Sequence, residues 1–344
     1  MSIKIAGMGW VTPLGTGLGE VYDLISQGVR AEVAELANPV SGRKHPYIPV
    51  PRKLVDAVGR NNRLRRSSAI SYFTATAGLA ALENTGIVMD ADSAERTAVI
   101  FAIVSGGVVY SRKFYETIVS QGANAASPLL FPETVFNAPG SHLCALLGIT
   151  GMSYTLVGDA TVGIAGLKLA EQLLETGDVD QCVVVGGEEV DWVLCEAYQH
   201  GRLSKREASS PKGMILAEGA AALVLKREGN LELEQIHDGI PFFARNEAGP
   251  AIARVIEATA PGAGLVVGSA NGTFIDQLES AGIARVNIPA VYPKQSLGEA
   301  LGASALIQTI YAALALEKES LDAVAVSCLG LNQQASGVRI RRCR

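Results

Sequence analysis

Short apolar runs alternate with longer alanine-rich stretches along most of the chain. The runs are rich in β-branched residues and end in glycine or serine, which is typical of buried strands: Ile3–Ala6, Thr97–Val104, Tyr154–Val157, Cys182–Val185, Ala221–Leu225, Gly264–Val267 and Ala323–Val326. The clearest helical stretches between them are Ile70–Asn84, Ile164–Glu175 and Ala300–Glu317. Strands that alternate with helices predict an α/β fold, with a largely parallel or mixed sheet covered on both faces.

A charged stretch, Lys226–Asn230, divides the chain into two parts of similar organisation. Each part opens with a strand that runs into a glycine-rich turn, and each ends with a strand after a long helix. This pattern indicates a duplicated βα unit. We therefore predict an N-terminal half over residues 1–226 and a C-terminal half over residues 227–344, packed as one compact unit.

The composition adds expectations about partners. Hydrophobic residues make up 48% of the 344 residues, enough for a sizeable core, while charged residues make up only 18%. A surface with few charges suggests that part of it is buried against another subunit. The net charge of −5 argues against nucleic-acid binding. The start of the chain lacks a signal-peptide pattern, and the longest apolar run is too short to cross a bilayer. We therefore expect no membrane association and a cytoplasmic location.

The cysteines and histidines do not form a recognisable metal or disulfide pattern. Five cysteines and four histidines are scattered along the chain, and no two cysteines have CxxC spacing. The sequence therefore predicts no metal site and no cofactor.

Two glycine-rich turns bear on chemistry. Gly7–Gly15 lacks the spacing of a dinucleotide fingerprint and the lysine of a P-loop, so a tight turn at the end of a strand is the plainer interpretation. In Tyr154–Gly163 a strand enters a sharp turn before a helix, a geometry that can present a nucleophile at a helix N-terminus. The residue at this elbow is Ala160, which has no nucleophilic atom.

Further segments follow in a fixed order: Val184–Glu189, Gly201–Ser204 with Gly213–Ala220, Val266–Thr273, Lys294–Ala303 and Val326–Leu331. Together with the two turns, they resemble seven motifs of the β-ketoacyl-acyl-carrier-protein synthases, the elongating type of the thiolase superfamily. The resemblance covers nearly the whole chain. It implies a thiolase-like fold of two duplicated βαβαβαββ halves in five layers, α-β-α-β-α.

The same resemblance indicates that this chain lacks the family's catalytic side chains. The family uses a cysteine to accept the acyl chain and two histidines to drive decarboxylation and stabilise developing charge. The motifs place Ala160 on the cysteine, Asn271 on the first histidine and Glu299 on the second, and they match Lys294 to the family's lysine. Glu299 would repel a malonyl carboxylate unless Lys294 neutralises it. We therefore expect a buried Lys294–Glu299 ion pair and no intact catalytic residue.

Two other observations support this interpretation. Cys328 lies in a motif segment, but no histidine occupies a matching position, so a small buried residue is the better interpretation. The C-terminal loop Leu329–Asn332 lacks the glycine pair that lets the family's loop swing open. A reduced or closed acyl tunnel is expected.

Non-catalytic members of the family are chain-length factors. The resemblance thus implies a heterodimer with a cysteine-containing ketosynthase, and an acyl carrier protein as a further partner, in polyketide, aryl-polyene or fatty-acid-type synthesis. Phe131, Thr134, Phe136, Leu329 and Leu331 are the expected tunnel or interface residues. A basic segment, Arg63, Arg65 and Arg66, is a candidate docking site for the acidic carrier protein, although a solvated helix start would look the same in sequence.

Two alternatives stay open at this point. One is a non-catalytic homodimer that serves as a scaffold or carrier-protein docking module. The other is an enzyme, either a malonyl-carrier-protein decarboxylase or a condensing enzyme that uses atypical residues.

Overall fold

One large mixed sheet organises the molecule, as the computed structural model shows for residues 3–332 and 334–343. Its ten strands follow the order β11-β10-β12-β13-β9-β1-β8-β6-β4-β5, and a separate small sheet has the order β2-β3-β7. The ten strands are β1 (Ile3–Val11), β4 (Thr97–Ile103), β5 (Ser153–Val157), β6 (Gln181–Glu188), β8 (Gly219–Lys226), β9 (Leu231–Pro241), β10 (Leu265–Val267), β11 (Ala290–Val291), β12 (Ala323–Leu329) and β13 (Gln334–Arg342).

The large sheet consists of two equivalent halves. In the first, β1 and β8 pair antiparallel, β8 and β6 antiparallel, and β6, β4 and β5 parallel. In the second, β9, β13, β12, β10 and β11 repeat the same sequence of pairings. The halves join where β1 pairs antiparallel with β9. The predicted duplication is therefore confirmed in the topology.

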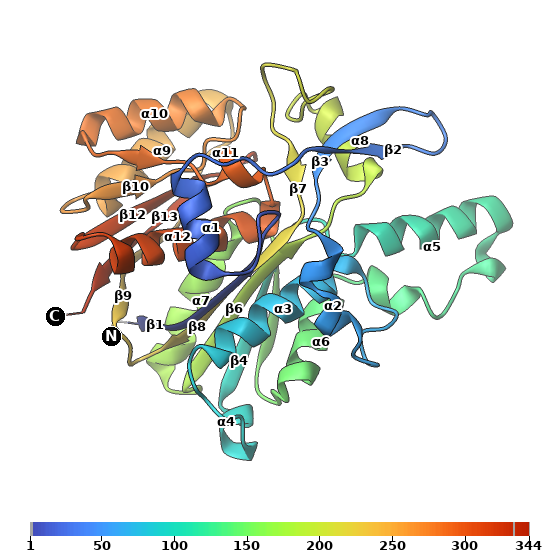
Figure 1. Ribbon diagram of the computed structural model, residues 1–344, viewed down its shortest axis with the longest axis horizontal. Coiled ribbons are helices and arrows are strands. Elements are labelled where there is room, and N and C mark those ends of the chain that lie inside the picture. Colours follow the sequence, from blue (N-terminus) through green and yellow to red (C-terminus); the bar gives the residue numbers. More distant parts are fainter. Residues whose placement is uncertain (1–2, 333, 344) are drawn as a thin grey trace.

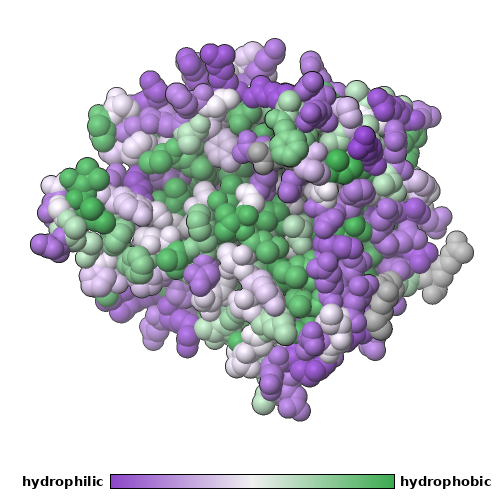
Figure 2. Space-filling view, turned by 180° about the vertical axis from the view of Figure 1, so that it is seen from behind, coloured by the Kyte–Doolittle hydropathy of each residue, from purple (hydrophilic) through white to green (hydrophobic). Residues whose placement is uncertain are grey.

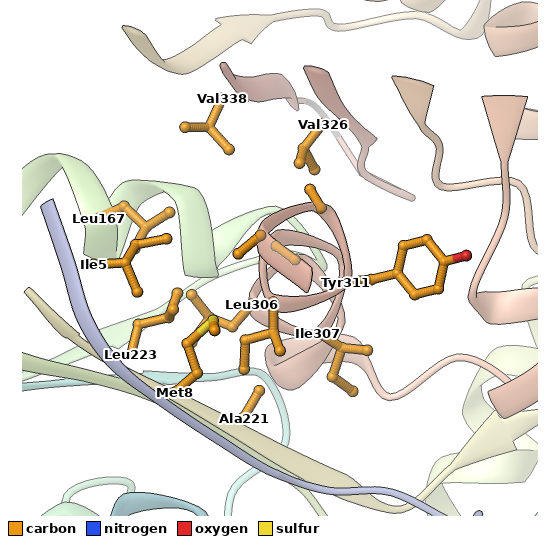
Figure 3. Close-up of a cluster of buried hydrophobic side chains, with 14 of the residues drawn as sticks. Ile5, Met8, Leu167, Ala221, Leu223, Leu306, Ile307, Tyr311, Val326 and Val338 are labelled. Atoms are coloured by element: carbon orange, nitrogen blue, oxygen red, sulfur yellow. The ribbon is translucent and has the colours of Figure 1, made fainter. Parts of the chain in front are cut away.

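Helices cover and separate the two halves of the sheet in five layers (Figure 1). α3 (Ala69–Glu83) covers the outer face of the first half and α9 (Arg245–Thr259) that of the second. α7 (Val162–Thr176) and α12 (Ser304–Lys318) lie between the halves. Around α12, Leu306 and Ile307 lie near Met8 and Ala221 of the first half (Figure 3). The central strands carry apolar residues on both faces of the sheet, because each face packs against helices.

The remaining elements connect these layers. The helices are α1 (Leu18–Ser26), α2 (Asp56–Gly59), α4 (Ala91–Glu95), α5 (Val108–Gln121), α6 (Ala138–Leu147), α8 (Trp192–His200), α10 (Ile275–Val286) and α11 (Lys294–Leu297). The small sheet contains β2 (Ala34–Ala37), β3 (Lys44–Ile48) and β7 (Leu216–Ala217). Short 3₁₀ turns are η1 (Arg52–Leu54), η2 (Ala123–Ala125), η3 (Phe131–Thr134) and η4 (Leu301–Ala303). α5 projects from the body of the molecule (Figure 1).

The first glycine-rich segment corrects one prediction. β1 does not end at Ala6 but continues to Val11, and the tight turn comes later, where Thr12 and Gly15 exchange backbone hydrogen bonds. A Cβ on Gly7 would lie 2.1 Å from the carbonyl oxygen of Ala81 in α3. The glycine in the strand therefore allows close approach of α3, rather than forming the turn.

The predicted division at residues 226 and 227 lies directly after β8, whose last residue is Lys226, and before β9, which begins at Leu231. As a domain boundary it stays a prediction. Within the described residues, no helix is long and apolar enough to cross a membrane.

Candidate functional site

Ala160 lies at the elbow between β5 and α7. It is buried, and the helix begins two residues later, with the backbone N–H of Val162 donating to the carbonyl of Asp159 at 2.8 Å. This is the strand–turn–helix geometry that the sequence predicted, with a methyl group where a nucleophile would stand.

Glu299 is the centre of a buried polar network (residues 271, 294, 299 and 304). Its Oε2 accepts from Lys294 Nζ at 2.8 Å and from Asn271 Nδ2 at 2.7 Å. Its Oε1 accepts from the hydroxyl of Ser304 at 2.6 Å and from the N–H of Leu301 at 3.1 Å. The structure thus brings three of the four predicted site residues into direct contact. The expected Lys294–Glu299 ion pair is present and buried, at 4% and 0% side-chain exposure.

The charge state of this pair follows from its surroundings. Burial is the largest single influence and works to lower the pKa of Lys294. The charge and hydrogen bond of Glu299, together with the nearby Cys328 and Glu279, outweigh it in sum, so that the pKa of Lys294 is raised above its ordinary value. Lys294 therefore remains protonated, and its positive charge is balanced by the carboxylate of Glu299. Asn271 completes its own bonding by accepting from the hydroxyl of Thr273 at 2.7 Å.

A second buried acid, Glu188, was not predicted. It lies at the end of β6 and accepts from the N–H of Gly302 at 3.3 Å and from both the N–H and the hydroxyl of Ser105. Burial raises the pKa of its carboxyl to about 8. Glu188 and Glu299 therefore bind consecutive amides of the same turn, those of residues 302 and 301. One sequence feature could have indicated this role. Glu188 occupies the variable position of the Gly-Gly-x-Glu motif, and an acidic residue at the end of a buried strand is unusual.

A third acid, Asp159, was also missed. Its carboxylate accepts from the N–H groups of Leu331 at 3.2 Å and Asn332 at 2.7 Å, in the loop that follows β12. Tyr198 lies within electrostatic reach of Asp159, Glu188 and Glu299, and burial with these acids raises the pKa of its phenol. Three carboxyl groups, those of Asp159, Glu188 and Glu299, therefore lie within electrostatic reach of one half-buried phenol.

A cavity of about 380 Å³ reaches this network from the surface. Asn271, Lys294 and Glu299 belong to its lining, whereas Ala160 does not. In the described part of the chain, no cluster of three or more His, Cys, Asp or Glu side chains is arranged to hold a metal ion.

Cys328 lies close to the network without the properties of a nucleophile. It is buried, and burial raises the pKa of its thiol to about 12, despite the opposing charge of Lys294. A thiol in this state is almost wholly protonated at neutral pH.

Three of the five predicted tunnel or interface residues, Phe131, Thr134 and Phe136, lie on an arm formed by residues 108–137. The arm comprises α5 and the segment through η3. Phe131 and Phe136 are exposed, at 54% and 45%, and the hydroxyl of Thr134 donates to the carbonyl of Phe131 at 2.7 Å. The ring of Phe136 packs on Gly106, where a Cβ would lie 3.0 Å from it. Gly106 directly follows Ser105, so the arm rests on the turn that holds Glu188.

Other exposed apolar side chains lie on the same arm and on or beside the neighbouring edge strand β5: Tyr115, Val119, Leu129, Val135, Met152, Tyr154 and Val157. β5 is the last strand of the sheet, so one of its edges has no strand partner in the described chain. The rear face of the molecule shows a broad band of hydrophobic residues across its middle (Figure 2). Edge strands and apolar patches of this kind favour association.

Leu329 and Leu331 are placed differently from the arm residues. Both are buried in the hydrophobic cluster of the second half, together with residues of α9. Their predicted role in a tunnel or interface stays a prediction.

The basic segment before α3 is accessible. Arg63, Arg65 and Arg66 are exposed, and no ion pair with an acidic side chain involves them in the portion that the structure describes. Their sequence-based assignment to carrier-protein docking stays a prediction.

Comparison with known families identifies the fold. Residues 1–230 match the family model "Beta-ketoacyl synthase, N-terminal domain". The chain belongs to the β-ketoacyl synthase family. A "Putative 3-oxoacyl-[acyl-carrier-protein] synthase, mitochondrial" of Schizosaccharomyces pombe is 23% identical, with 92% of this chain and 86% of that protein covered. The "3-oxoacyl-[acyl-carrier-protein] synthase 2" of Vibrio cholerae is 24% identical over 47% of this chain, and the match spans only 42% of that relative's length.

Solved ketosynthase structures share the whole fold. A β-ketoacyl synthase from Burkholderia phymatum superposes with a TM-score of 0.86 at 17% identity, covering 100% of both chains. "The ishigamide ketosynthase/chain length factor" gives 0.84 at 16% identity, covering 100% of this chain and 99% of that one. A ketosynthase in complex with its chain length factor, from Xenorhabdus doucetiae, gives 0.78 at 17% identity, covering 99% and 98%. The predicted thiolase-like fold is therefore confirmed.

Proposed function

We propose that this chain is a non-catalytic member of the β-ketoacyl synthase family, a chain-length-factor-like subunit that pairs with a cysteine-containing ketosynthase and shapes the cavity in which that partner's product grows. The reaction served would be polyketide, aryl-polyene or fatty-acid-type chain synthesis. The single observation that carries the proposal is the buried network in which Glu299 binds Lys294 and Asn271, beside an elbow that holds Ala160.

The network argues against condensation by this chain alone. Ala160 offers no atom for a thioester, and the negative Glu299 is opposed to binding a malonyl carboxylate. Both oxygens of Glu299 and the oxygen of Asn271 are already hydrogen-bonded within the chain. The decarboxylase and atypical-enzyme alternatives would need free proton-handling groups in this place, so the geometry supports them less.

The apolar arm supports the pairing. Exposed Phe131 and Phe136, together with the free edge of β5, form a surface that water solvates poorly. A partner subunit that covers this surface would bury the two phenylalanine rings. The arm would then line part of the partner's cavity. Solved neighbours of this fold include ketosynthases in complex with a chain length factor.

The arginine segment supports contact with an acyl carrier protein. Arg63, Arg65 and Arg66 are exposed and lack acidic partners among the described residues, so an acidic protein surface would gain charge contacts there. One solved neighbour is a ketosynthase with its type II polyketide acyl-carrier protein.

The test is co-expression of this chain, carrying an affinity tag, with an untagged cysteine-containing ketosynthase from the same organism. We expect the two to co-purify at equal stoichiometry and to elongate a carrier-bound chain only together. A stable homodimer of this chain that ignores the ketosynthase would contradict the proposal and favour the scaffold alternative. Release of carbon dioxide from malonyl-carrier protein by the purified chain alone would favour the decarboxylase alternative.

A further inference from the structure

The carboxylate of Asp159 joins two segments that lie far apart in the sequence. Its Oδ1 accepts from its neighbour's amide, the N–H of Ala160, at 2.6 Å, and from the N–H of Leu331 at 3.2 Å. Its Oδ2 accepts from the N–H of Asn332 at 2.7 Å. Three backbone donors, one at the elbow before α7 and two in the loop after β12, thus converge on one side chain.

The loop is shaped around this carboxylate. The N–H of Gly330 donates to the carbonyl of Gln334 at 2.8 Å, which closes the loop into a turn. A Cβ on Gly330 would lie 2.1 Å from Asp159 Oδ2. A residue with a side chain at position 330 is therefore incompatible with Asp159 in its observed position.

Convergent backbone N–H groups at a helix N-terminus favour a negative oxygen. Such a set of donors is also what stabilises the oxygen of a thioester or tetrahedral intermediate at a nucleophile elbow. Here the donors are already occupied by a side chain of the same chain. In addition, a negative charge next to residue 160 raises the pKa of any thiol placed there.

We propose that Asp159 is an internal anion that fills the amide cradle at the elbow and holds the C-terminal loop closed on α7. It blocks the elbow independently of the missing cysteine, so restoring that cysteine alone leaves the site unreactive. This inference concerns the chain by itself and does not depend on the proposed partner.

The first test places a thiol at the elbow. We compare Ala160→Cys with the double variant Asp159→Asn, Ala160→Cys, and follow alkylation by iodoacetamide at residue 160 across pH by peptide mass spectrometry. Because removal of the adjacent charge lowers the thiol pKa by about one unit, we expect alkylation at pH 7 to be about tenfold faster in the double variant. Equal rates, including no reaction in either variant, would overturn the inference.

The second test reads the loop directly by amide hydrogen exchange. We expect Asp159→Ala to speed exchange of the peptide containing residues 329–332 at least tenfold. The matched control is Asp90→Ala, which removes the side chain of an aspartate that also accepts a backbone N–H, that of Ser93 at 2.8 Å. The control should leave the loop unchanged. Unchanged exchange of the loop in Asp159→Ala would also overturn the inference.

Steric coupling gives a third readout if either variant folds poorly. Gly330→Ala alone should destabilise the protein, and Asp159→Ala should remove most of that penalty, because the clashing oxygen is gone. A double-mutant cycle measured by chemical denaturation should therefore show non-additivity. Additive losses would show that the two residues do not constrain each other.

Discussion

The Oε2 atom of Glu299 lies 2.8 Å from the Nζ atom of Lys294, and neither side chain is accessible to water by more than a few per cent. The motif match predicts that Glu299 stands where members of the family carry a catalytic histidine. Here it carries a charge that is neutralised by the retained lysine. The pair has a structural consequence that can be measured.

Lys294→Met should destabilise the fold strongly. It leaves the buried Glu299 without its counter-charge, which costs about 3–5 kcal/mol of unfolding free energy. The double variant Lys294→Met, Glu299→Gln should recover most of that loss, because the unpaired charge is removed. Chemical denaturation measures both values.

The control is Lys44→Met, which breaks an ion pair with Glu35 whose side chains are 65% and 62% exposed. It should cost at most about 1 kcal/mol. A similarly small loss for Lys294→Met would mean that the buried pair contributes no more than a surface pair.

Glu188 should make stability fall as pH rises. Burial raises the pKa of its carboxyl from 4.5 to about 8, so between these values the folded state holds a proton that the unfolded state has released. Stability is therefore full below pH 4.5 and decreases by about 1.4 kcal/mol per pH unit up to pH 8 for this group. Above pH 8 both states are ionised and the contribution is constant.

Glu188→Gln should flatten the curve of unfolding free energy against pH by that amount, measured by denaturation at pH 5 to 9. Part of the slope should remain, because burial also raises the pKa of Glu189, to about 7. The exposed Glu35→Gln is the matched control and should leave the slope unchanged. Parallel curves for Glu188→Gln and the natural protein would contradict the assigned pKa.

Val157→Lys should abolish pairing with a ketosynthase while leaving the isolated chain folded. Val157 is 55% exposed on the edge strand β5, so a lysine there costs little in the free chain but would be desolvated in the complex. Val88→Lys is the same chemical change at a site that is 83% exposed in the connection between α3 and α4. Co-purification should survive only in the control, and its survival in both variants would place the interface elsewhere.

Reversal of the basic segment should weaken binding of an acyl carrier protein. With Arg63, Arg65 and Arg66 replaced by Glu, we expect at least a tenfold rise in Kd at low salt, and the difference should shrink as salt screens the charges. Titration calorimetry or fluorescence anisotropy measures this. Arg254→Glu, a charge reversal at an exposed site on α9, serves as a control for a charge reversal outside the basic segment. Equal effects of a single reversal at Arg254 and the triple change would argue against a specific docking site.

Much of the fold could be read from local patterns. The seven predicted strands are all present, although β1 extends to Val11 and the last long helix, α12, begins only at Ser304. The turn at Leu301 breaks that helix, because the amides of Leu301 and Gly302 are held by Glu299 and Glu188. Residues 188 and 302 are remote in sequence, so no local periodicity contains this constraint.

The sequence by itself determined the order of the elements, the duplicated pattern and the identities of Ala160, Asn271 and Glu299 at motif positions. Each of these depends only on residue type and spacing along the chain. Only the tertiary structure decided that Asp159 binds the amides of Leu331 and Asn332, and that Glu188 accepts a hydrogen bond from the N–H of Ser105. Those contacts form because separate strands end at the same edge of the sheet and their loops meet there, a convergence that the packing of the two halves creates.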